Sequence, residues 1–245
     1  MRYFIELRYD GSAYSGWQRQ PDAASVQEIV EDRLSNILGY PAEITGCGRT
    51  DKGVHARQYF AHLDMEKEPD ENFLFRINNY LPPAVAIRRI IPVPEDAHAR
   101  FDAIQRTYHY HVHFRKNPFL DRYSFYYQKS KNFSLTTLNT FSQTLPAFSD
   151  FKPFAKFHSD VHHHRCRVSC CEWTSSEDGY QLAITSDRFL RGMVRLIAGA
   201  SLRFAEGKIS IEDLEDAMTA GEQIKAAWAV PAHGLSLIKI DYPYI

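Results

Sequence analysis

The sequence lacks the features that mark membrane-spanning and extracellular proteins. No apolar run approaches the roughly 20 residues that a membrane helix needs. The chain has only four cysteines, at positions 47, 166, 170 and 171, and their spacing is not that of a disulfide framework. Near Met1, the charged residues Arg2 and Glu6 stand too close to apolar residues for a signal peptide. We therefore expect reduced thiols, a cytoplasmic protein and no membrane association.

The sequence also lacks a net charge of either sign. The formal charge is −1 over 245 residues, whereas proteins that depend on phosphate contacts are often basic overall. Any surface for nucleic acid must then come from local clustering of Lys and Arg. Apolar residues make up 44% of the chain and aromatic residues 13%, which is enough for a packed globular core and excludes a disordered chain.

Strand and helix patterns follow one another irregularly along the chain. Alternating apolar residues and turn residues predict strands over residues 2–9, 42–47, 57–64, 84–93, 107–114, 165–173, 180–187 and 235–241. Helical spacing predicts helices over residues 25–39, 70–80, 134–145, 189–207 and 210–220. This order is not that of a parallel doubly wound sheet, so it indicates an α+β fold with a largely antiparallel sheet. We expect a boundary near 105 that divides the chain into lobes 1–105 and 106–245.

Two local signals bracket the first predicted helix. Ser25 with Glu28 three residues later has the form of a capping box, and Gly39 predicts the helix end. The preceding stretch is a glycine-containing loop in which Tyr14 and Trp17 are expected to be exposed, together with Arg19.

The segment Gly48–Ala56, with the sequence GRTDKGVHA, concentrates polar groups between two predicted strands. Its glycines allow a tight backbone and the close approach of a ligand. Asp51 lies between Arg49 and Lys52, which should keep its carboxylate ionised at neutral pH. An ionised carboxylate on a fixed loop, with cations available for phosphates, can act as a nucleophile or a base. A charged turn with a local ion pair is the ordinary alternative, and spacing alone favours it.

The same segment closely resembles the signature loop of the tRNA pseudouridine synthase A family, whose pattern is G-R-T-D-x-G-V-H. Further motifs of that family are matched in order along nearly the whole chain. They lie at Tyr9–Gln20, Ser25–Glu28, His98–Phe101, Arg106–Tyr110, Asp150–Phe154, Phe189–Arg195 and Gly234–Leu237. One such motif would be a weak signal, but an ordered set of this length is specific.

The resemblance implies three catalytic residues. Asp51 would be the nucleophile, Tyr108 the aromatic residue that packs on the target uracil, and Arg195 the cation that pairs with the nucleophilic carboxylate. Arg49 would occupy the space left by the flipped nucleotide. The family reaction breaks the glycosidic bond of uridine, rotates the uracil and rejoins it through C5, without metal or nucleotide cofactor. The residues leave open whether Asp51 attacks C1′ or C6, or removes a sugar proton.

The resemblance also implies a fold and partners. The pseudouridine synthase fold has two similar α+β lobes that form a continuous, mainly antiparallel sheet flanked by helices, with a central cleft. The family acts as a homodimer on uridines 38, 39 and 40 of the tRNA anticodon stem-loop. The expected substrate contacts are Arg19, Arg49, Lys52, Arg100, Arg106, Tyr108, Arg188 and Arg191. Arg188, Arg191 and Arg195 are expected to share one face of the helix over 189–207.

The chain departs from the family pattern at several positions. Lys52 stands where alanine is commoner, and Ser236 stands where tyrosine is frequent. Gly192 replaces a larger polar residue in the helix motif and is expected to loosen that helix by roughly 1 kcal/mol.

Two other interpretations stay open. A protein of the same fold could bind RNA as a catalytically weak paralogue, although the set of Asp51, Tyr108 and Arg195 speaks against this. The cluster of His162–His164 with Cys166 and Cys170–Cys171 could hold zinc, which histidine and thiolate ligands favour. The cysteines lack the C-x₂-C spacing of zinc sites, so a histidine-rich loop that touches RNA is favoured over a metal site.

Overall fold

The computed structural model describes residues 1–128, 133–156 and 162–245. The chain divides into two compact units, Met1–Ile104 together with Ser236–Ile245, and Gln105–Leu235. Both units combine a sheet with helices, so the expected α+β class is confirmed. The division expected from the sequence, 1–105 and 106–245, differs in the last stretch, because Ser236 and Leu237 pair with strand β3 of the first unit.

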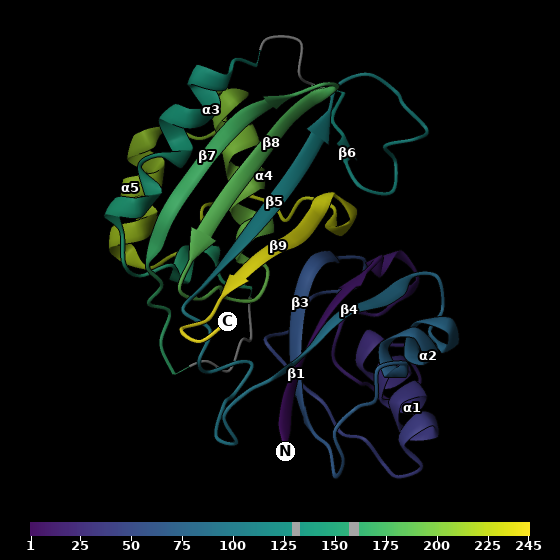
Figure 1. The fold of residues 1–245 in the computed structure, drawn as a ribbon. Coiled ribbons are helices and arrows are strands. Elements are labelled where there is room, and N and C mark those ends of the chain that lie inside the picture. Colours follow the sequence, from purple (N-terminus) through teal and green to yellow (C-terminus); the bar gives the residue numbers. More distant parts are fainter. Residues whose placement is uncertain (129–132, 157–161) are drawn as a thin grey trace. The chain divides into compact units, whose positions relative to one another are not determined.

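The first unit is built on the strand β1 (Arg2–Tyr9). It pairs in antiparallel fashion with β3 (His55–Asp64) on one side and β4 (Val85–Pro92) on the other. The short strand β2 (Thr45–Gly46) pairs with β3, and β9 (Leu235–Asp241) joins β3 in parallel. The helices α1 (Val26–Leu38) and α2 (Phe73–Tyr80) lie together beside this sheet (Figure 1).

Strand β1 is buried along most of its length, on both of its faces. Tyr3, Ile5 and Leu7 are buried as the alternation predicts, but Phe4 on the opposite face is buried as well. Glu6 is also buried, and its carboxylate accepts hydrogen bonds from Arg88 and Arg89. A buried carboxylate of this kind needs such partners because burial disfavours an unpaired charge.

The predicted boundaries of α1 are confirmed. The hydroxyl of Ser25 accepts a hydrogen bond from the amide of Glu28 at 3.3 Å, and Gly39 ends the helix in a left-handed conformation, with φ of 80°. The expected exposure of Tyr14 and Trp17 is wrong, since both are buried. Trp17 instead stacks on Tyr59 of β3, with ring centroids 4.0 Å apart, which ties the loop to the sheet.

The second unit has an antiparallel sheet in the order β5 (Gln105–His113), β8 (Gly179–Ser186) and β7 (Val168–Ser176). The two-residue strand β6 (Phe125–Tyr126) pairs in parallel with the end of β5. The helices α3 (Leu135–Ser142), α4 (Met193–Ala205) and α5 (Ile211–Ala220) lie together on one face of this sheet (Figure 1). Among the described helices, none combines the length and the apolar composition that crossing a bilayer requires.

The helix expected over residues 189–207 begins later, at Met193. Gly192 precedes it with φ of 75°, a left-handed conformation that glycine adopts at little cost. The expected loosening by Gly192 is therefore wrong, since the residue lies outside the helix and suits its backbone. Arg188 and Arg191 also precede the helix, so they do not share a helical face with Arg195.

Candidate active site

The segment that carries Asp51 forms a compact turn between β2 and β3. The amide of Cys47 donates to the carbonyl oxygen of Phe60 at 2.8 Å, and the amide of Val54 donates to the carbonyl oxygen of Asp51 at 3.1 Å. Gly53, inside this turn, has φ of 80°, which favours glycine. These bonds hold Asp51 on a defined backbone at the end of a buried strand, as the sequence pattern predicts.

A second segment, far away in the sequence before α1, supports the turn. The hydroxyls of Tyr9 and Thr50 lie 2.9 Å apart, and the amide of Trp17 donates to the carbonyl oxygen of Thr50 at 3.3 Å. A Cβ added at Gly16 would stand only 2.3 Å from that same oxygen. The glycine therefore permits a backbone approach that any side chain would block, and it places the Tyr9–Gln20 motif directly against the residue before Asp51.

The other glycine of that motif has a similar role at the far end of the turn. A Cβ added at Gly11 would stand 2.0 Å from the carbonyl oxygen of Val54. The amide of Gly11 donates to Nδ1 of the buried His55 at 3.1 Å. Both ends of the segment Gly48–Ala56 are thus held by the same N-terminal stretch.

A small pocket of about 130 Å³ opens beside the turn. It brings together Arg49 and Arg100, which are both exposed and come from different motifs. Its other lining residues are Trp17, Gln18, Gln27, Ile44, Thr45, Gly46 and Gly48. Two guanidinium groups beside one polar pocket are suited to an anionic ligand such as a phosphate.

Gln27 is a structural residue of this region that sequence reasoning missed. Its side-chain Oε1 accepts from Nε2 of Gln18 at 2.8 Å and from the backbone amide of Arg19 at 3.1 Å. Its side-chain Nε2 donates to Oε1 of Glu31 at 2.9 Å and to the backbone carbonyl oxygen of Ile44 at 3.1 Å. Gln27 therefore links the loop before α1 to the segment that leads through β2 into the turn with Asp51. The motif Ser25–Glu28 contained this residue, but its role depends on contacts that only the fold creates.

The positive charge of Arg19, which was expected to contact the substrate, is partly neutralised by nearby carboxylates. Its guanidinium lies 3.8 Å from the carboxylate of Glu28 and 3.5 Å from that of Glu31. Arg49 and Lys52, in contrast, are exposed on the turn that carries Asp51. The charge of Arg19 is shared with two carboxylates, so Arg49 and Lys52 are better placed than Arg19 to meet an anionic ligand.

In the second unit, Tyr108 lies on β5 and is half-buried. Its ring meets that of Phe189 edge to face, with centroids 5.1 Å apart and an angle of 85° between planes. Arg106, two residues earlier, donates from Nη1 to the carbonyl oxygen of Asp187 at 2.9 Å. The turn that contains Phe189 is thereby fixed against β5, beside the ring of Tyr108.

Arg195 lies in the first turn of α4 and is held by the chain that follows α5. Its Nε donates to the carbonyl oxygen of Val230 at 2.7 Å, and the amide of Val230 donates back to the carbonyl oxygen of Arg195 at 3.3 Å. The neighbouring Tyr110 is fully buried, and burial raises its pKa well above the usual value, although the charge of Arg195 opposes this. Arg195 is therefore a fixed cation rather than a mobile surface group.

Arg188 and Arg191 lie in the turn before α4. Nη1 of Arg188 is 3.2 Å from both ring nitrogens of His163. The carboxylate of Asp187 accepts from the backbone amides of Arg167 and Arg188, at 2.8 and 2.7 Å. The turn is thus rigid at its start, and Arg191 is exposed within it.

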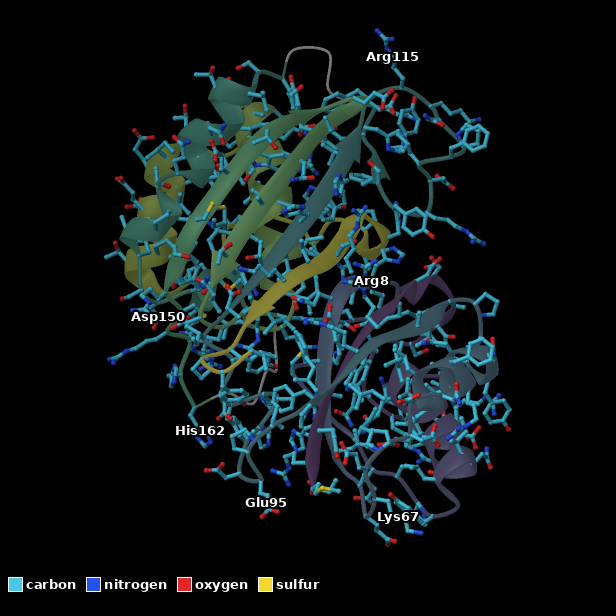
Figure 2. The ribbon with its side chains drawn as sticks, in the orientation of Figure 1. Arg8, Lys67, Glu95, Arg115, Asp150 and His162 are labelled. Carbon is cyan, nitrogen blue, oxygen red and sulfur yellow. The ribbon has the colours of Figure 1, made fainter. Side chains whose placement is uncertain are left out.

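The histidine and cysteine cluster does not gather around one point. His162 is exposed at the surface (Figure 2), whereas Cys166 and Cys171 are buried. Burial raises the pKa of the Cys166 thiol to about 12, which disfavours the thiolate that zinc binds. Within residues 1–128, 133–156 and 162–245, no three side chains of His, Cys, Asp or Glu come close enough to hold one metal ion.

The predicted site residues divide between the two units. Five of them, Asp51 with Arg19, Arg49, Lys52 and Arg100, belong to the first unit. The others, Arg106, Tyr108, Arg188, Arg191 and Arg195, belong to the second.

Comparison with known proteins agrees with these motifs. A family model described as tRNA pseudouridine synthase matches residues 7–102 and 148–243. The chain is 41% identical to the tRNA pseudouridine synthase A of Porphyromonas gingivalis, over 99% of this chain and 97% of that protein. It is 40% identical to the protein of the same name from Bacteroides thetaiotaomicron, over 99% and 91% of the two chains. A third, from Chlorobium chlorochromatii, is 32% identical over 97% and 98%.

Proposed function

Because the chain belongs to the tRNA pseudouridine synthase family, we propose that it isomerises uridine to pseudouridine in tRNA, with Asp51 as the nucleophile. The observation that carries the assignment is the catalytic turn itself. The turn is fixed by Tyr9, Gly16 and Trp17, so the matching motifs of the sequence are also physical neighbours. An enzyme of this family is an isomerase, since its product has the same atoms as its substrate.

The target base must first leave the RNA stack, because the bond between N1 and C1′ is not accessible to a side chain inside a helix. In the proposal, Arg49 fills the space that the flipped nucleotide leaves. The ring of Tyr108 packs on the extruded uracil, and its edge-to-face contact with Phe189 supports this orientation.

The chemical step exchanges one bond of the sugar for another. The N1–C1′ bond breaks, the uracil turns, and C5 bonds to C1′; the proton at C5 leaves and N1 gains one. Asp51 acts on the sugar or the base during this exchange, and Arg195 favours the charged, nucleophilic form of its carboxylate. The anchoring of Arg195 by Val230 supports this role, because a fixed cation needs no reorganisation during the reaction.

The substrate uridines in the proposal are positions 38, 39 and 40 of the anticodon stem-loop. The protein acts as a cytoplasmic homodimer, as the family resemblance implies. Arg49, Lys52 and Arg100 in the first unit, and Arg106, Arg188 and Arg191 in the second, contact the RNA backbone.

A single assay tests the assignment. Unmodified tRNA is incubated with the purified protein without added nucleotide cofactor, and pseudouridine is mapped along the RNA. The wild-type protein is expected to modify positions 38, 39 and 40. Asp51→Asn is expected to give no product while its affinity for tRNA stays within about three-fold of wild type, because the amide keeps the size of the side chain and loses the nucleophile.

Asp70→Asn is the matched control, since Asp70 is an exposed aspartate of the same unit that pairs with Arg76. It should keep full activity. An active Asp51→Asn protein would contradict the nucleophile assignment. A wild-type protein that binds tRNA without forming product would instead identify a catalytically weak paralogue.

A further inference from the structure

A second and larger cavity lies in the second unit, outside the residues of the proposed active site. Its volume is about 290 Å³. Four of its lining residues are aromatic, and the full set is Phe125, Tyr126, Tyr127, Gln128, Arg203 and Trp228. None of these residues belongs to the motifs that resemble the family, so the proposed reaction gives them no role.

The aromatic rings stand at angles to one another around the cavity. The ring of Phe125 is 5.7 Å from that of Trp228, at 72°, and 5.5 Å from that of Tyr127, at 51°. The guanidinium carbon of Arg203 lies 5.8 Å from the centroid of Trp228. Phe125 and Trp228 are half-buried, so each ring keeps an accessible surface on which a flat ligand can stack.

The backbone fixes the Trp228 wall of the cavity. A Cβ added at Gly199 of α4 would stand 1.9 Å from the carbonyl oxygen of Trp228. The helix and the segment that carries Trp228 are therefore packed as closely as a glycine permits. The backbone of Trp228 is held in place before any ligand arrives, which lowers the entropy cost of binding.

Two of the lining residues each carry an N–H group without a hydrogen-bond partner among the described residues. Nε of Arg203 and Nε1 of Trp228 are buried atoms that have no hydrogen-bond partner among the residues that the structure describes. An unpartnered buried donor is costly, and native proteins rarely keep one without a reason. A flat ligand would stack on the aromatic surfaces, and acceptor atoms on its edge would suit the guanidinium group of Arg203.

Among the residues that the structure describes, Glu206 is the carboxylate that pairs with Arg203, and it already has other partners. Glu206 accepts from the hydroxyl of Tyr127 at 2.6 Å and from Nη1 of Arg203 at 2.6 Å, and it lies 3.2 Å from Nζ of Lys208. Burial tends to raise the pKa of Glu206, but these three donors lower it to about 2. Two cations thus share one anion, and the remaining positive charge favours a ligand that carries phosphate.

We propose that this aromatic pocket, formed by Phe125, Tyr126, Tyr127, Gln128, Arg203 and Trp228, binds an unpaired nucleobase of the tRNA, separate from the uridine that is modified. A nucleobase offers a flat ring and acceptor atoms at its edge, and the nucleotide supplies a negative phosphate. Stacking of one base on an aromatic side chain is worth about 1–3 kcal/mol. The inference rests on the proposed function in one respect, namely that the substrate is RNA.

Part of the tryptophan fluorescence of the protein comes from this pocket, and the Trp228→Phe variant identifies that part. Trp17 and Trp173 are each only 1% exposed, so Trp228 is the accessible tryptophan. Titration with uridine and adenosine 5′-monophosphates should quench the emission in a saturable way, whereas inorganic phosphate should not. Trp228→Phe should lose the quenching, because the reporter ring is gone while the pocket keeps an aromatic wall.

Turnover gives a second measurement. Trp228→Ala and Phe125→Leu should each raise the KM for tRNA roughly ten-fold, since each removes one stacking surface. The kcat at saturating tRNA should stay unchanged, because neither residue touches the reacting uridine in the proposal. Phe75→Ala is the control, since Phe75 is an aromatic residue of the first unit with 70% of its surface exposed. It should leave both constants unchanged.

Three outcomes would overturn the pocket proposal. Mononucleotides that do not quench Trp228 would exclude base binding. A KM for Trp228→Ala equal to that of Phe75→Ala would exclude a role in RNA affinity. A change in oligomer mass by light scattering, in place of a change in tRNA affinity, would identify the pocket as a contact between copies of the chain. The mononucleotide titration involves no catalysis, so its failure is separate from failure of the proposed reaction.

Discussion

The α-carbon of Gly16 lies against the carbonyl oxygen of Thr50, so closely that a Cβ at position 16 would be 2.3 Å from it. The two residues belong to different motifs and are brought together only by the fold. Thr50 immediately precedes Asp51, so the contact connects the shape of the N-terminal loop to the position of the proposed nucleophile. Gly16 also has φ of 98°, a backbone conformation that residues with a side chain rarely adopt.

Substitution of Gly16 tests this connection. Gly16→Ala should lower kcat by about 10- to 100-fold, because the new methyl group displaces Thr50 and with it Asp51. Gly39→Ala is the matched control: Gly39 also has a positive φ, but nothing lies within 4 Å of a Cβ there. Both variants should lose about 1–2 kcal/mol of unfolding free energy from backbone strain, and Gly39→Ala should keep its kcat. Equal kcat values for the two variants would show that the contact between Gly16 and Thr50 does not affect catalysis.

The contributions of the hydroxyl group and of the ring of Tyr108 can be distinguished by substitution. Tyr108→Phe keeps the edge-to-face contact with Phe189 and should bind tRNA with unchanged affinity. If the hydroxyl removes the C5 proton, kcat should fall by about 100-fold. Single-turnover rates measured beside tRNA binding distinguish the two contributions. A Tyr108→Phe protein with normal turnover would leave only the stacking role.

The salt dependence of tRNA binding should report on Arg49 and Arg100, which line the same small pocket. Replacing either with Gln should reduce the slope of log Kd against log salt by about one, because one phosphate contact is lost. Arg76→Gln provides the comparison, since Arg76 already pairs with Asp70 at 2.9 Å, and its slope should match wild type. Binding by the wild-type protein that does not weaken with salt would argue against phosphate contacts altogether.

The stability of the first unit should depend on the ionisation of His62. Burial, helped by repulsion from His98 and Arg2, lowers the pKa of His62 to about 4, and its Nδ1 accepts a hydrogen bond from the amide of Ala99 at 3.1 Å. The folded pKa is below the unfolded value of about 6.5. The contribution of His62 to the free energy of unfolding is therefore fully present above pH 6.5. It is lost as the pH falls towards 4, by up to about 3 kcal/mol.

Chemical denaturation at several pH values checks this expectation. His62→Gln should flatten the fall between pH 6.5 and 4, because the amide can accept the hydrogen bond from Ala99 and does not titrate. His162→Gln, at an exposed position (Figure 2), should follow the wild-type curve. A wild-type curve that is flat over this range would show that His62 titrates normally.

The local signals of the sequence were reliable where they depend on neighbours along the chain. The hydroxyl of Ser25 and the left-handed Gly39 bound α1 as predicted, because a helix cap is satisfied within a few residues. Ser210 and Gly221 bound α5 in the same way. The motif around Asp51 likewise lies in a tight turn, since its glycines and polar residues form their bonds locally.

The predictions that were wrong concerned features that the pattern of apolar residues does not describe, namely packing between distant segments and local backbone conformation. Trp17 looked like an exposed loop residue, yet it stacks on Tyr59, because the loop before α1 lies against β3. Gly192 looked like a defect inside a helix, yet it provides the left-handed residue from which α4 starts. The pattern of apolar residues could not distinguish these cases, since it describes each segment without its neighbours.

The sequence by itself determined the family, the α+β class and the residues that could carry the chemistry, because ordered motifs and local periodicity are properties of the linear chain. Only the tertiary structure decided that Gly16 supports Thr50, that Gln27 links the N-terminal loop to Ile44, and that Phe125, Arg203 and Trp228 share a pocket. These relationships arise from close packing and hydrogen bonds between residues far apart in sequence, whose geometry no local pattern encodes.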